Sequence, residues 1–216
     1  MWMGTERGLY AYDGYHFYPH FEEHSFSNQR VHCVRRAGDR LYLGCDNGLL
    51  LYNIRANRYE KVPVGGPKDI RAVLFGGRKV YLGSSQGLYS YDPFLKKIRK
   101  EGNEHSAVYS LLKTRTGLLV GTINGLFFYD RHNVRPVRIT TGRQPLVNAM
   151  AFDRKRNCIW LGTEGALYAY RNGKLSEAKA LKGNSVKSLT VDDHGTLFIG
   201  TDNGLYTYDR EGKTER

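Results

Sequence analysis

The sequence predicts an all-β fold, a β-propeller made of four-stranded antiparallel blades. Two observations lead to this prediction: a hairpin motif recurs six times at a nearly constant spacing, and strand-like segments fill the chain between the copies. No segment shows a sustained helical periodicity with capping residues at its ends. Glycine and tyrosine, at 25 and 16 of 216 residues, suit many short strands joined by tight turns.

Each copy of the motif contains a glycine, a leucine five residues later and a tyrosine eight residues later. The glycines are 38 to 41 residues apart and are Gly4, Gly44, Gly83, Gly121, Gly162 and Gly200. The tyrosines are Tyr12, Tyr52, Tyr91, Tyr129, Tyr170 and Tyr208. Because a repeated unit must bury its face against its neighbours, we expect the leucines and tyrosines to pack between blades.

Each motif also predicts a β-hairpin, with an apolar strand before the glycine and an alternating strand after it. Three copies contain Asn-Gly in the link, which favours a type I′ turn. In the fifth copy Ala166 stands where the others have glycine. Either the turn begins one residue earlier, with Gly165, or Ala166 adopts a left-handed conformation.

Two further strands are expected in each period. Strand A precedes the motif, strands B and C form it, and strand D follows it. The predicted A strands are 31–35, 70–75, 108–112, 147–152 and 186–191. The predicted blades are approximately 1–28, 29–68, 69–106, 107–145, 146–184 and 185–216.

Five of these blades are complete, and the first lacks its A strand. An unclosed propeller leaves strand edges unpaired. We therefore expect a single partial propeller, a fragment of a larger one, that self-associates through its unclosed blades or forms a homodimer.

The motif Trp160-Leu-Gly-Thr, followed by a looser Gly-x-Leu-x-x-Tyr, resembles the two-component regulator propeller repeat of bacterial hybrid two-component sensors. The resemblance covers essentially the whole chain, with departures at Cys45, Ser84 and Ala166. It implies a non-catalytic periplasmic sensor domain that recognises a poly- or oligosaccharide breakdown product. It also implies that the full-length protein is a histidine kinase, whose kinase modules this segment lacks.

Two other functions remain open from the residues alone. Propellers also serve as protein-interaction scaffolds and host lyases or lactonases, so the fold does not decide between them. The sequence shows no convergent cluster of acid, base or metal-binding residues that would favour an enzyme. The first residues do not resemble a signal peptide, and no membrane span is expected in this segment.

A metal site or cofactor is not expected either. His16, His20 and His24 recur every four residues, but along a strand this spacing separates side chains by about 13 Å. One zinc ion needs its ligands much closer together. Cys33, Cys45 and Cys158 are expected to be small buried residues rather than a disulfide framework.

If a sugar binds, we expect it where the B–C turns and D–A loops meet. Amides, charged side chains and a stacking ring are the groups that recognise sugars. The candidate contacts are His24, Phe26, Asn28, Asn103, His105, Arg143 and Gln144.

The opposite edge, formed by the A–B and C–D turns, is rich in basic residues. The predicted basic face consists of Arg36, Arg40, Arg78, Lys79, Arg115, Arg131, Arg154, Lys155 and Arg156. This face either binds something acidic, such as a sulfated or uronic glycan or a membrane surface, or is a solvated surface that aids solubility. Few aromatic residues accompany it, so no nucleic-acid partner is expected.

Overall fold

The computed structural model describes residues 1–20, 29–62, 66–102, 105–130, 133–137, 143–178, 181–209 and 214–216. In these ranges the regular elements are β-strands, arranged in six antiparallel sheets of three or four strands. The prediction of an all-β protein with the four-stranded blades of a β-propeller is confirmed. Within the same ranges, no helix has the length and apolar character needed to cross a membrane.

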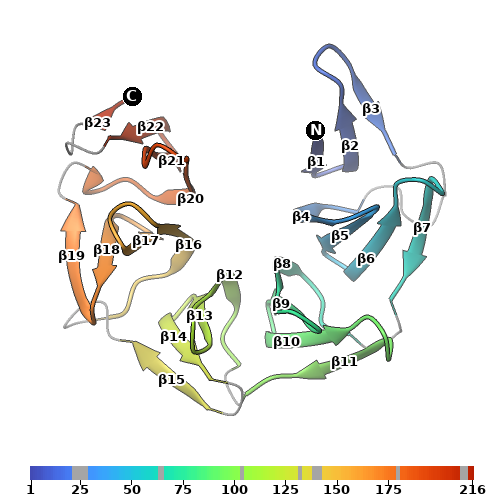
Figure 1. Cartoon of the computed structure of the whole chain (residues 1–216), viewed down its shortest axis with the longest axis horizontal. Helices are drawn as coiled ribbons and strands as arrows, with labels where there is room; N and C mark the ends of the chain where they lie inside the picture. The colour runs from blue at the N-terminus through green and yellow to red at the C-terminus, as the bar shows by residue number, and fades with distance from the viewer. Residues whose placement is uncertain are drawn as a thin grey trace. The chain divides into compact units, whose positions relative to one another are not determined.

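The chain forms two compact units, and the first is Met1–Val108. Its strands are β1 (Trp2–Thr5), β2 (Gly8–Tyr12), β3 (Phe17–Pro19), β4 (Val31–Ala37), β5 (Arg40–Cys45), β6 (Gly48–Asn53), β7 (Arg58–Lys61), β8 (Ile70–Phe75), β9 (Val80–Ser84), β10 (Gly87–Asp92) and β11 (Lys97–Lys100). Consecutive strands pair to give the sheets β1-β2-β3, β4-β5-β6-β7 and β8-β9-β10-β11 (Figure 1). The first sheet has three strands because it lacks strand A, as predicted.

The second unit is Tyr109–Arg216. Its strands are β12 (Val108–Lys113), β13 (Leu118–Thr122), β14 (Gly125–Tyr129), β15 (Val134–Val137), β16 (Val147–Asp153), β17 (Cys158–Thr163), β18 (Leu167–Arg171), β19 (Lys174–Ala178), β20 (Val186–Val191), β21 (Leu197–Thr201), β22 (Gly204–Tyr208) and β23 (Thr214–Glu215). They form three four-stranded sheets, each with strands A to D in chain order. The predicted A strands coincide with β4, β8, β12, β16 and β20 to within two residues at either end.

Within each unit, neighbouring sheets pack against each other through the repeat leucines and tyrosines. Leu9 of the first blade lies in one cluster with Leu41, Leu43 and Tyr52 of the second. Leu126 and Leu161 pack together in the same way between the fourth and fifth blades. The sixth copy is an exception, because its Leu205 is 60% exposed.

In the second and fifth copies, the first glycine of the motif allows the next blade to approach. A Cβ on Gly44 would lie 2.5 Å from the carbonyl oxygen of Ile70, and one on Gly162 would lie 2.5 Å from Cγ1 of Val186. Both partners belong to the A strand of the following blade. Any larger residue would push the neighbouring strands apart, which explains why glycine is required at this position.

The turn prediction is wrong for the Asn-Gly copies. Positive φ occurs at Gly48 (119°), Gly125 (107°) and Gly204 (123°), whereas the preceding asparagines are not among the described residues with positive φ. A type I′ turn needs positive φ at both central residues, so the glycine instead closes the hairpin as in a G1 bulge. In the fifth copy positive φ falls one residue earlier, on Gly165 (99°), while Thr163 and Ala166 close the hairpin as Thr5 and Gly8 do in the first copy.

Candidate functional site

Four A strands carry a β-bulge at their second residue. The register between strands A and B shifts at this point in β4, β8, β16 and β20. The bulge residues are His32, Arg71, Asn148 and Lys187, and Tyr109 has the same place in β12. Because a bulge redirects a side chain out of the regular alternation, these positions can present polar groups at the B–C turn edge.

His32 illustrates this geometry in the first unit. Its Nε2 lies 2.7 Å from Oδ1 of Asp46, in the B–C turn of its own blade, and 3.2 Å from Oδ1 of Asp69, in the loop before β8. Arg71 donates from Nε and Nη2 to the two oxygens of Asp69, at 3.0 and 2.6 Å. Hydrogen bonding to Arg71 holds the pKa of the Asp69 carboxyl below its ordinary value.

The same edge continues into the first blade. Arg30 lies just before β4, and its Nη2 donates to Oε1 of Glu6 in the first B–C turn at 3.0 Å. Cations and carboxylates therefore alternate along this edge of the first unit. We call the group Glu6, Arg30, His32, Asp46, Asp69 and Arg71 the edge cluster.

Part of the edge cluster has the ligand types of a metal site. The ligand atoms of His32, Asp46 and Asp69 lie within 4.8 Å of one another. Arg71, however, already binds both oxygens of Asp69, and its positive charge opposes a cation at that carboxylate.

The corresponding edge of the second unit carries amides. Asn148 Nδ2 donates to the carbonyl oxygen of Val186 at 2.9 Å, and Asn203 Nδ2 donates to Oδ1 of Asn184 at 2.8 Å. These side chains again come from an A strand, a B–C turn and a D–A loop. The two units thus use the same elements to present polar groups.

Three of the seven predicted sugar contacts lie among the described residues. His24, Phe26, Asn28 and Asn103 lie outside them. His105 is exposed before β12 in the first unit, and Arg143 and Gln144 precede β16 in the second. Gln144 lies against a B–C turn, since a Cβ on Gly125 would be 2.7 Å from its Cβ. A D–A loop and a B–C turn therefore meet here.

The sequence reasoning missed the bulge positions. Their signal is present in the repeat, because each of the five residues directly follows the first apolar β-branched residue of strand A, as in Val31-His32 and Ile70-Arg71. Inward-facing residues of a regular strand are two positions apart, and one extra polar residue between them breaks this alternation. Aligning the A strands as well as the hairpins would have revealed it.

Comparison with known proteins shows which solved structures the chain resembles. No protein-family model and no curated protein matches it. Two solved structures of the extracellular domain of BT4673 from B. thetaiotaomicron, described once as a putative one component system and once as a putative hybrid two component system, do match. Each is 35% identical over 100% of this chain, with a TM-score of 0.89. Over its whole length the chain is therefore similar to part of the extracellular domain of this putative two component system.

The chain spans 31% of the length of those two matched chains. The extracellular domain of the putative hybrid two component system BT3049 from the same organism is 18% identical over 100% of this chain and 37% of that one, with a TM-score of 0.63. At that identity the likeness supports the fold alone.

At the A–B and C–D turns, several predicted basic residues have acidic partners. Arg40 lies 3.8 Å from Glu60, Arg78 lies 3.6 Å from Asp92 and Lys79 lies 3.0 Å from Glu101. Arg36, Arg115, Arg154 and Lys155 are exposed, and Arg131 lies outside the described residues. The positive charge of this edge is thus partly neutralised by neighbouring carboxylates.

Arg156 differs from the rest of the basic face. Its side chain is only 16% exposed, and Nη1 donates at 2.6 Å both to Asp153 Oδ2 and to the carbonyl oxygen of Gly195. Nη2 donates to the carbonyl oxygen of Asp209. Although burial raises the pKa of Asp153, hydrogen bonds from Arg156 outweigh it and hold that pKa below its ordinary value. Arg156 therefore ties the fifth blade to the sixth.

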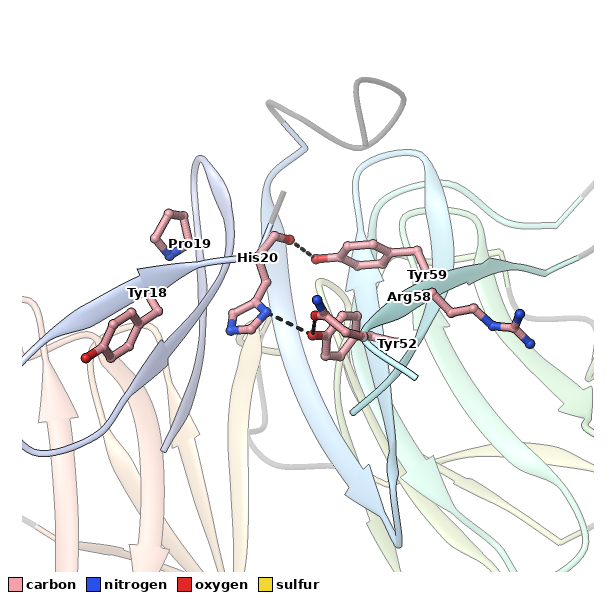
Figure 2. Close-up of a pocket in the computed structure, with 7 residues that line it drawn as sticks. Tyr18, Pro19, His20, Tyr52, Arg58 and Tyr59 are labelled. Carbon is pink, nitrogen blue, oxygen red and sulfur yellow. Dashed lines mark hydrogen bonds between the residues drawn. The ribbon is translucent and has the colours of Figure 1, made fainter. Parts of the chain in front are cut away.

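The groove between the first and second blades is largely filled by aromatic side chains (Figure 2). The Tyr52 hydroxyl donates to Oδ1 of Asn57 at 2.5 Å, so Nδ1 of His20, 2.8 Å away, is the donor to the hydroxyl oxygen. The Tyr59 hydroxyl donates to the carbonyl oxygen of His20. The Trp2 ring lies against the His20 ring in a tilted arrangement, with 4.8 Å between the ring centres. A cavity of only 120 Å³ remains.

The three cysteines are free thiols. Burial raises the pKa of Cys33 to about 11 and that of Cys45 to about 12. Burial also raises the pKa of Cys158. A thiol is nucleophilic as the thiolate, so these groups stay protonated near neutral pH and are poor nucleophiles.

Proposed function

We propose that this chain is the non-catalytic, ligand-sensing propeller of a bacterial hybrid two-component sensor, and that its ligand is an oligosaccharide. The observation that carries the proposal is the 35% identity over the whole chain to the extracellular domain of BT4673. By this relationship the segment lies outside the cytoplasmic membrane, in the periplasm, and the full-length protein is a sensor histidine kinase.

The edge cluster supports a hydroxyl-rich ligand. It presents carboxylates, a histidine and guanidinium groups, and the second unit adds the amides of Asn148 and Asn203 on the same kind of edge. Oligosaccharides are recognised by several such groups acting together, because each hydroxyl can donate and accept. Arg143 and Gln144, which lie beside a B–C turn, are further candidates for contact.

The chemistry of the side chains supports the absence of catalysis in this segment. The thiols are protonated, and the carboxylate of Asp69 has its pKa lowered by Arg71 rather than raised for proton donation. A general acid at neutral pH needs a carboxyl whose pKa is raised. The Asp69 carboxylate therefore fits binding better than proton transfer.

The experiment is a thermal-shift screen of the protein against neutral and acidic oligosaccharides. A ligand that binds the folded state raises the apparent melting temperature. We expect at least one oligosaccharide to do so, and Arg71→Ala to abolish the shift because it removes both hydrogen bonds to Asp69. Arg36→Ala, an exposed arginine on the opposite edge, is the matched control and should leave the shift unchanged.

Two results would count against the proposal. A shift that persists in Arg71→Ala and His32→Ala would remove the edge cluster from the binding site. Release of shortened or modified sugars on incubation, followed by chromatography, would contradict the absence of catalysis.

A further inference from the structure

The groove between the fourth and fifth blades is open, and it lies entirely within the second unit. It has a volume of 580 Å³, within the range of sites that hold small molecules. It is lined by the A–B turn 114–116 and by residues of β13, β14 and β15 in the fourth blade, and by Ile159 and Tyr170 of the fifth blade. None of these residues is acidic.

Repeat positions show why this groove is open. Val137 has the place of His20, since Pro136 pairs with Phe127 of β14 as Pro19 pairs with Tyr10 of β2. The large imidazole that fills the first groove is therefore replaced by an isopropyl group. When a large side chain is replaced by a smaller one and no other side chain fills the space, a cavity remains.

The fifth blade removes the other two fillers. Leu175 pairs with Tyr170 where Tyr59 pairs with Tyr52, so a leucine stands in place of an aromatic ring. The C–D turn is also shorter, because only residues 172–173 connect the paired ends, compared with 54–57 in the second blade. Gly173, directly before β19, has the place of Asn57 directly before β7, and it has no side chain to accept a hydrogen bond. Accordingly, no hydrogen bond of the Tyr170 hydroxyl occurs within the described residues.

Two arginines give the groove its charge. The guanidinium carbon of Arg135 lies 4.9 Å from the centre of the Phe128 ring, and Arg115 is exposed on the A–B turn. Among the described residues, no carboxylate lies within salt-bridge distance of either arginine. Stacking on an aromatic ring orients a guanidinium group while leaving its N–H donors free for a planar carboxylate.

The remaining lining suits a sugar ring. Leu119, Val137 and Ile159 provide apolar surface for the C–H face of a ring, and Phe128 provides an aromatic face. Tyr170 supplies a hydroxyl that can donate to or accept from a ring hydroxyl. A ligand that matches all these features combines a polar ring with one carboxylate.

We propose that the groove between the fourth and fifth blades binds a uronic acid residue, with its carboxylate on Arg115 and Arg135 and its ring on the apolar floor. This site lies beside the A–B turn and strand D in the second unit, whereas the edge cluster belongs to the first unit. It therefore goes beyond the sensing site proposed above and does not depend on it.

The test is isothermal titration of the protein with methyl glucuronide, glucose and acetate. Glucose has the ring without the carboxylate, and acetate has the carboxylate without the ring. We expect methyl glucuronide to bind at least about tenfold more tightly than either, because charge-assisted hydrogen bonds and ring contacts act together. Equal binding of acetate and methyl glucuronide would overturn the proposal, since the groove would then be a simple anion site.

Variants locate the binding site. Arg135→Gln should weaken methyl glucuronide at least about tenfold, and Arg135→Lys should recover only part of that loss because lysine lacks the planar fork. Arg154→Gln is the matched control: it removes the same charge from an exposed position on the same edge outside the groove, and should change the affinity less than about twofold. Similar weakening by Arg154→Gln and Arg135→Gln, or no weakening by either, would overturn the proposal.

Discussion

The groove between the first two blades and the groove between the fourth and fifth occupy the same place in the repeat but differ in content. In the first, Tyr52 bonds to His20 and Asn57, and a cavity of 120 Å³ remains. In the second, Tyr170 has the same position beside a groove of 580 Å³. The repeat thus determines how the strands are arranged around each groove, whereas a few neighbouring side chains determine whether the groove is filled or open.

The largest expected difference concerns the two equivalent tyrosines. Tyr52 is 2% exposed, so Tyr52→Ala should lower the free energy of unfolding by about 3–5 kcal/mol through lost burial and a new cavity. Tyr170 borders a groove that is already open, so Tyr170→Ala should cost only about 1–2 kcal/mol. Urea denaturation of both variants measures this; equal losses would mean that the two grooves are energetically alike.

Removing only the hydroxyl sharpens the comparison. Tyr52→Phe should lower the free energy of unfolding by about 1 kcal/mol, since His20 and Asn57 each lose a hydrogen-bond partner. Tyr170→Phe should change the free energy of unfolding by less than about 0.5 kcal/mol, because its hydroxyl makes no such bonds within the described residues. The same denaturation experiment is the measurement, and a larger effect at Tyr170 would break the comparison.

Filling the open groove should weaken its ligand binding. The double variant Val137→His and Leu175→Tyr introduces the side-chain types found at the same positions in the first groove. It should reduce methyl glucuronide affinity about fivefold, a loss of roughly 1 kcal/mol. Titration calorimetry measures the change, with Val134→Thr at the half-buried start of β15, outside the groove lining, as a control for altered strand composition. Unchanged affinity in the double variant would show that groove volume is irrelevant.

The smallest expected effect is that of pH. The residues that line the open groove include no histidine, aspartate or glutamate, and the carboxyl of a uronic acid is ionised between pH 5 and 8. Methyl glucuronide affinity should therefore stay constant within about twofold from pH 5 to 8. A strong dependence in this range would point to a histidine and hence to another site.

Much of the fold was predictable because it depends on residues that recur. The glycine, leucine and tyrosine of each motif lie in equivalent places, so their spacing predicted the hairpins and the blades. The turn type was not predictable from Asn-Gly alone. A glycine with positive φ fits both a type I′ turn and a G1 bulge, and the strand register decides between them.

The candidate sites were less predictable because they depend on residues that differ between copies. His32 meets Asp69 only because a bulge turns it toward the next blade. The open groove arises from what is missing, such as the imidazole that Val137 replaces. A deviation from a repeat is visible in a sequence, but the space it leaves depends on the packing of two sheets.

The most direct test of the difference between the grooves is hydrogen–deuterium exchange with and without saturating methyl glucuronide. Ligand contacts slow exchange of the backbone they order. We expect slower exchange in peptides covering 114–116 and 134–137, at the open groove, and no change in those covering 17–20 and 57–59, at the filled groove. Protection of the first groove instead, or of neither groove, would contradict it.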